Sequence, residues 1–143
     1  MSGMIGEIGS RSGVIGTTEL EYEEGSWTPV STSINLIPSS GANYTRIGNR
    51  VTVSAYITTN QASSGDFIIS GLPFTNTGAS QASGSIYLRD THSNLDGYAS
   101  IIIASSTQFY VRRGGRTDSG NNVLSYMDAG SNFWFSLTYE IGA

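Results

Sequence analysis

Carboxylates crowd one short stretch of the chain, YEEGSWTPV at 22–30, in which Glu23 and Glu24 are adjacent. The two catalytic carboxylates of a glycosidase converge on the substrate from opposite sides, about 5–9 Å apart. Adjacent side chains of an extended chain point in opposite directions, so this pair is not arranged for glycoside hydrolysis. We interpret the stretch as a structural joint, in which Gly25 permits a bend and Trp27 fills one end of a core. The glutamates are expected to be solvated or paired with arginines of a neighbouring subunit.

His92 is the only histidine and lies in a polar loop, RDTHSNLDGY. A nucleophilic triad needs a histidine beside an activated serine, and the chain has no G-x-S-x-G motif. Asp90, Asn94 and Asp96 alternate with His92 like the oxygen ligands of a calcium site. An EF-hand loop, however, has glycine at its sixth position and glutamate at its twelfth, and this loop has neither. We predict no catalytic, metal or cofactor site, and no enzymatic activity.

The only basic cluster is VRRGGRTD, which contains Arg112, Arg113 and Arg116. Guanidinium groups are bidentate donors and can bind a phosphate, an acidic sugar or an acidic patch of a neighbouring subunit. The alternative is a glycine-led hairpin of solvated arginines with Asp118 as a counter-charge. If the cluster is functional, we expect Arg112 and Arg113 to contact a partner subunit.

The 143-residue chain has no cysteine, a net charge of −4 and only 13% charged residues, and all seven of its cationic residues are arginines. It therefore forms no disulfides and offers no lysine for Schiff-base or phosphate-loop chemistry. The acidic balance opposes general nucleic-acid binding, which needs a basic face. Without a basic segment leading into an apolar run, and without about 20 consecutive apolar residues, we expect neither a signal peptide nor membrane insertion.

Alternation of apolar and polar residues with a period of two dominates the chain from Trp27 onward. It is clearest in RVTVSAYITT at 50–59, and Gly48-Asn49 just before it predicts a tight hairpin. Further strands are expected at 26–31, 34–37, 66–70, 84–89, 98–104, 107–113, 122–127 and 132–139, with turn residues between them, including 38–41. Short strands at this spacing predict an all-β fold, an antiparallel β-sandwich or barrel.

The last predicted strand, NFWFSLTYE, has aromatic side chains on both faces. Phe133 and Phe135 share one face, whereas Trp134 lies on the other. An antiparallel sheet commonly leaves one face to solvent, and that face is then polar. We therefore expect the outer face at Trp134 to be covered by another subunit.

Residues 1–25 are expected to form an extended arm and residues 26–143 a single β-sandwich domain. Glycine recurs about every third residue near the N-terminus, which disfavours a helix. The apolar side chains between these glycines do not suit a solvated linker, so we expect them to become ordered on a partner. The alternative is a disordered terminus. The apolar residues are Met4, Ile5, Ile8, Val14 and Ile15.

Three segments together resemble a module of tailed-bacteriophage virion proteins: YEEGSWTPV at 22–30, YTRIGNRVTVSAYIT at 44–58 and ISGLPF at 69–74. The module recurs at the ends of tail fibres and in small capsid-decorating proteins. The resemblance covers residues 10–74, about half of the chain. It implies a β-sandwich or jelly-roll domain that assembles as a homotrimer, made in the host cytoplasm and carried on the virion.

Of the two functions in this family, capsid decoration is the one we expect. The chain begins about 20 residues before the domain, without a shaft or coiled-coil heptads. A trimeric knob that docks on the major capsid protein through three apolar arms gains avidity, because each arm raises the effective concentration of the others.

The alternative is a receptor-binding tip of a tail or head fibre that recognises a host-surface glycan. In that case the exposed loop aromatics and polar residues would bind the sugar. The candidates are His92, Tyr98 and Tyr110.

Overall fold

The computed structural model describes residues 21–61, 66–77, 82–91, 99–103, 107–113 and 127–142, without the side chains of 38–40, 99–103 and 113. Within these residues the chain is all-β, as predicted. The strands are β1 (Tyr22–Ser26), β2 (Leu36–Ile47), β3 (Arg50–Thr59), β4 (Phe67–Ser70), β5 (Ala82–Arg89), β6 (Ala99–Ile103), β7 (Gln108–Arg113) and β8 (Asn132–Glu140). The apolar residues predicted to line the arm and most of the strand predicted at 122–127 lie outside the described residues.

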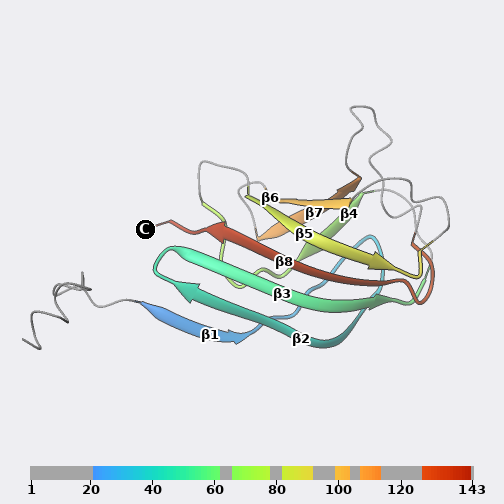
Figure 1. Cartoon of the computed structure of the whole chain (residues 1–143), viewed down its shortest axis with the longest axis horizontal. Coiled ribbons are helices and arrows are strands. Elements are labelled where there is room, and N and C mark those ends of the chain that lie inside the picture. The colour runs from blue at the N-terminus through green and yellow to red at the C-terminus, as the bar shows by residue number, and fades with distance from the viewer. Residues whose placement is uncertain are drawn as a thin grey trace, which may run out of the picture.

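All described strand pairs are antiparallel, in the order β1-β2-β3-β8-β5-β6-β7-β4. The sheet bends so far that its β6-β7-β4 end lies over its middle strands (Figure 1). An isolated bridge between Val30 and Ser70 links the segment after β1 to β4, at the opposite end of the strand order. The predicted antiparallel β-sandwich is therefore confirmed, and the homotrimer stays a prediction.

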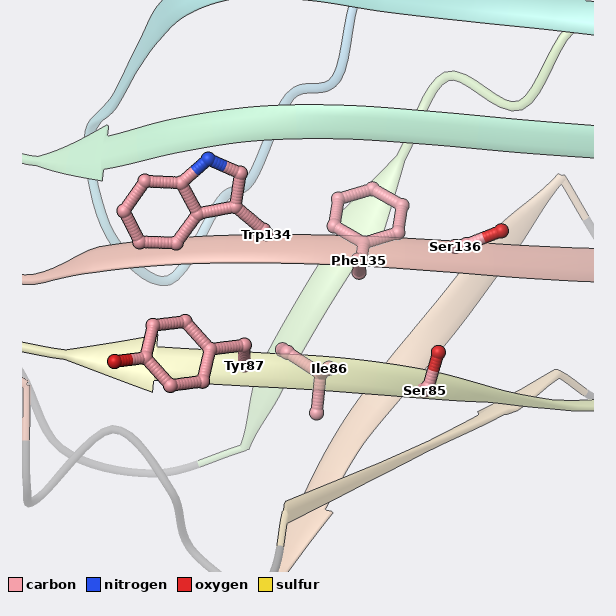
Figure 2. Close-up of a pocket in the computed structure, with 6 residues that line it drawn as sticks. All are labelled: Ser85, Ile86, Tyr87, Trp134, Phe135 and Ser136. Atoms are coloured by element: carbon pink, nitrogen blue, oxygen red, sulfur yellow. The ribbon is translucent and has the colours of Figure 1, made fainter.

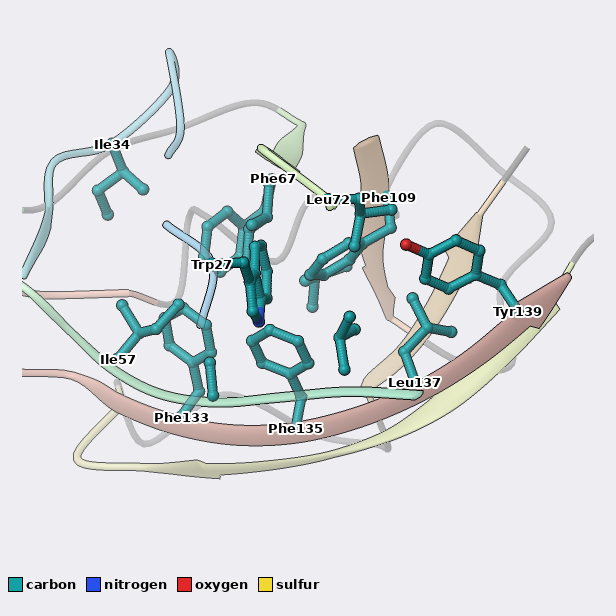
Figure 3. Packing of buried hydrophobic residues seen from close by; sticks show 14 of the residues in the cluster. Trp27, Ile34, Ile57, Phe67, Leu72, Phe109, Phe133, Phe135, Leu137 and Tyr139 are labelled. Carbon is teal, nitrogen blue, oxygen red and sulfur yellow. The ribbon is translucent and has the colours of Figure 1, made fainter. Parts of the chain in front are cut away.

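Aromatic rings join the two layers of the sandwich. Phe67 of β4 meets Phe133 of β8 with ring centroids 5.2 Å apart, and Phe109 of β7 meets Phe135 of β8 at 5.1 Å. Trp27 lies in the same core, 8% exposed, with its ring edge-on to Phe135 at 6.1 Å (Figure 3). Because these rings come from the β7-β4 end of the strand order, from the middle strand β8 and from the segment after β1, burying them closes the sheet on itself.

Strand β3 shows why the period-two pattern predicts this fold well. Its Val51, Val53 and Ile57 are fully buried, while Thr52 and Ser54 between them are exposed. One face therefore lines the core and the other faces outward, as the alternation requires. The hairpin before β3 is also confirmed, and within its two-residue turn only Gly48 has positive φ, at 59°.

Two local predictions are wrong. The strand expected at 26–31 is formed instead at 22–26, where β1 pairs with β2 at the sheet edge, and within 27–31 only Val30 forms a β-bridge, an isolated one to Ser70. The turn expected at 38–41 does not end a strand: β2 continues through it with two register shifts, and Gly41 has a φ of 71°. Turn-forming residues inside a long strand produce a bulge when the partner strand continues beside them.

Candidate binding face

The outward face of the β3-β8-β5 part of the sheet carries cross-strand rows of similar side chains. The register places Thr52 beside Thr138, and their hydroxyl oxygens are 2.9 Å apart. In the next row Ser136 lies between Ser54 and Ser85. The side chains in these rows are small, polar and uncharged, so they leave the strand backbones accessible from outside.

The third row is aromatic and consists of Tyr56, Trp134 and Tyr87. The rings of Tyr56 and Trp134 stack with centroids 4.3 Å apart and planes 10° apart. Tyr87 lies 5.6 Å from Trp134 at an angle of 45° and is 62% exposed. The Tyr56 hydroxyl donates to Asn132 Oδ1 at 2.9 Å, and Asn132 Nδ2 donates to Asp90 Oδ2 at 2.9 Å. These bonds hold the Tyr56–Trp134 stack in place.

A shallow hollow of about 380 Å³ lies between the aromatic row and the serine row. Figure 2 shows Tyr87 and Trp134 at one end of it and Ser85 and Ser136 at the other, on the neighbouring strands β5 and β8. We call these four residues, together with Tyr56, the aromatic face. Of the aromatic face, the sequence singled out Trp134 and missed Tyr56 and Tyr87. Their outward positions follow from the period-two pattern, whereas their adjacency depends on strand register.

The glutamates near the start of the domain have partners within the same chain. Arg46 pairs with Glu21 and lies 3.9 Å from Glu23 Oε2. Tyr44 donates its hydroxyl to Glu23 Oε1 at 2.6 Å, and this bond raises the pKa of Tyr44. The Arg46 guanidinium also lies 5.4 Å from the ring centre of Phe74. This pairing supports a structural role for Glu23.

The other glutamate of the pair, Glu24, points the opposite way, as expected for neighbours in a strand. It accepts a hydrogen bond of 2.7 Å from the Tyr22 hydroxyl, which raises the pKa of Tyr22. Gly25 does not form the expected bend, since it lies inside β1. A Cβ there would lie 2.8 Å from the Tyr44 ring, so the glycine makes room for that ring.

The candidate arginine cluster is described only in part. Arg112 donates to Asp66 Oδ1 at 2.6 Å, and its guanidinium lies 4.7 Å from the ring centre of Tyr110. Its acidic partner is thus within this chain, across the β4-β7 pair. Arg113 ends β7, and its side chain is outside the described residues, as are the predicted loop residues His92 and Tyr98.

Among the described residues, no group of three or more histidine, aspartate or glutamate side chains is placed to hold a metal ion. Nor does the described part of the chain include a helix that could span a membrane.

No protein-family model and no curated protein matches the chain. Among solved structures, the chain is similar to the crystal structure of the Dettilon tailspike protein (gp208), with a TM-score of 0.60 and 25% sequence identity. The match covers 85% of this chain and 24% of the tailspike chain, so this chain corresponds to about a quarter of that protein. This likeness indicates a structural protein of a phage virion.

Proposed function

We propose that this chain is a non-enzymatic β-sandwich module of a phage tail fibre or tailspike, assembled as a homotrimer. The observation that supports this position is the likeness to a tailspike, because a match over 85% of the chain must include most of the second half, where the virion-protein motifs are absent. A module of this kind contributes a rigid, β-rich unit to a larger assembly at the virion exterior.

The arrangement of the charged groups supports a structural role over a catalytic one. The carboxylates of Glu21, Asp66 and Glu140 each lie within ion-pair distance of an arginine. A hydrolytic carboxylate pair must instead face a common substrate position. Each of these ion pairs joins neighbouring strands or the residues beside them, which supports a structural role for the three carboxylates.

Capsid decoration is the second candidate function, and the apolar residues of the segment 1–20 favour it. Side chains such as Ile5, Ile8 and Ile15 need a partner surface, and a capsid could supply one to all three arms of a trimer. The two candidates differ in where the protein sits on the virion.

Imaging of labelled virions tests the proposal. A gold-conjugated antibody fragment raised against residues 21–142 is expected to mark the tail in electron micrographs, and native mass spectrometry of the purified protein is expected to give a trimer. Label distributed over the head would overturn the tail position and support decoration. In that event, deleting residues 1–20 should abolish binding of the trimer to undecorated capsids.

A further inference from the structure

The aromatic face has the chemistry of a carbohydrate site. We infer that it binds one or two pyranose rings of a glycan, with the apolar C–H side of a sugar lying on Trp134 and Tyr87. The inference rests on the proposed place at the virion exterior, because only there would this face meet a host-surface glycan.

The first argument is the match between the groups present and those of a sugar. A pyranose has an apolar side of C–H groups and a rim of hydroxyls. Aromatic rings present an electron-rich surface to such C–H groups. Trp134 and Tyr87 form one wall of the hollow, and the Ser85 and Ser136 hydroxyls, each a donor and an acceptor, form the opposite end.

The second argument is that these polar groups are available. Within the described part of the chain, no hydrogen bond involves the Trp134 indole N–H, the Tyr87 hydroxyl, or the Ser85 and Ser136 hydroxyls. The hollow is shallow, so a sugar on the rings keeps its outer side in solvent.

The third argument is that the wall is organised before a ligand arrives. Trp134 is stacked on Tyr56, whose hydroxyl is fixed by Asn132. A ring that is already held in place loses little conformational entropy on binding, and such preorganisation favours affinity. Tyr87 completes the wall from the neighbouring strand and is the most accessible of the three rings.

The same face is poorly suited to a second copy of this chain. Stable protein interfaces bury about 800 Å² on each partner and have an apolar, aromatic-rich centre in which serine is depleted. Here the three rings are followed by rows of serine and threonine, including Ser54 and Thr52. The serine-rich row beside the rings favours a hydroxyl-rich ligand over a subunit contact centred on the rings.

The experiment uses the full-length chain, labelled with a fluorophore, on a microarray of bacterial surface polysaccharides. We expect binding to at least one polysaccharide, and saturation-transfer NMR with an oligosaccharide from it should show contact at sugar C–H protons. Tyr87→Ala should weaken binding by at least about tenfold. Tyr22→Ala is the matched control and should bind normally, because Tyr22 is similarly exposed, at 60% against 62%, but lies on the edge strand β1.

Three outcomes would overturn the inference: no polysaccharide bound, equal binding by Tyr87→Ala, or a stable oligomer that Tyr87→Arg dissociates, which would assign the face to a second copy. Antibody labelling of the tail would stand in each case, so failure of this inference is distinct from failure of the proposed function. Because Tyr87 is exposed, its substitution should leave the fold intact, and circular dichroism checks this directly.

Discussion

At the scale of single residues, the fold depends on a few positions at which only one residue type fits. At one of them the backbone conformation excludes a side chain, and at another a buried hydroxyl holds the backbone of a loop. Gly71 has a φ of 95°, and a Cβ there would lie 2.3 Å from the Thr28 carbonyl oxygen. Tyr139 is 1% exposed, and its hydroxyl exchanges hydrogen bonds with the backbone of Phe74 at 3.0 and 3.3 Å. Each of these contacts fixes a loop against the sandwich.

Gly71→Ala is expected to destabilise the protein more than Gly130→Ala. Both glycines have φ near 95°, so both substitutions incur backbone strain of about 1–3 kcal/mol. Only Gly71 adds a clash with backbone, which costs roughly another 1–3 kcal/mol, because no atom lies within 4 Å of a Cβ at Gly130. Urea denaturation of both variants measures the difference in their free energies of unfolding. Equal losses of stability would show that the contact with the Thr28 carbonyl adds no cost at Gly71.

The buried hydroxyl of Tyr139 is expected to make the stability of the protein fall at alkaline pH. Burial raises its pKa from 10.0 to about 12, against the opposing effect of the hydrogen bond to Phe74. Above pH 10 the unfolded chain loses this proton first, so stability is unaffected below pH 10 and falls between pH 10 and about 12.

Tyr139→Phe should remove this contribution to the alkaline loss. At neutral pH it should cost about 1–3 kcal/mol, since the Phe74 N–H and C=O lose their partner. Tyr87→Phe is the control, with an exposed hydroxyl and little expected change. Denaturation curves at pH 8, 10 and 11.5 measure the free energy of unfolding of both variants. If this free energy falls with pH as steeply in Tyr139→Phe as in the unmodified protein, Tyr139 is not the source of the alkaline loss.

At the scale of elements, β1 is a short edge strand stabilised mainly by its neighbour β2. The Tyr44 ring lies over Gly25, and the Tyr44 hydroxyl and Arg46 both reach Glu23. An aromatic ring that covers a glycine on the facing strand shields the exposed backbone there. Charged side chains along the edge also discourage pairing with strands of other molecules.

Gly25→Val should therefore loosen β1 while leaving the central strands intact. The new side chain must displace the Tyr44 ring, and with it the bond to Glu23. Hydrogen exchange should become faster at the Trp27 amide, which donates to the Ala42 carbonyl, and stay slow in β3 and β8. Ser26→Val, at an exposed position of the same strand, is the control. Unchanged exchange at the Trp27 amide would show that the Tyr44 ring contributes nothing to holding this edge.

At the scale of the whole molecule, one core holds both layers, so the domain should unfold as a unit. Trp27 lies between the layers and packs against Phe135, and its indole N–H reaches the Ser54 carbonyl at 3.4 Å. The segment that carries it links the edge strand β1 to β4 through the Val30–Ser70 bridge. This segment closes the sandwich.

Trp27→Ala is expected to lower stability by about 3–5 kcal/mol while the transition stays single. Val30→Ala, at a half-exposed position three residues on, should change stability by less than about 1 kcal/mol. Calorimetry and guanidinium denaturation report both quantities. Two separate transitions in the Trp27 variant would show that the layers have independent cores.

Much of this protein follows from local sequence. Period-two alternation in β3 and β8, the Gly48 hairpin and the core position of Trp27 were all predictable, because burial of one strand face acts on each residue separately. The aromatic face was not. Tyr56, Trp134 and Tyr87 lie far apart in the chain, and only the β3-β8 and β8-β5 registers bring them into one row. The continuous path of β2 through its bulge, and the closure of the sheet by the Val30–Ser70 bridge, likewise depend on which strands become neighbours. Strand pairing is a long-range choice made by the whole core, and the tertiary structure alone decides it.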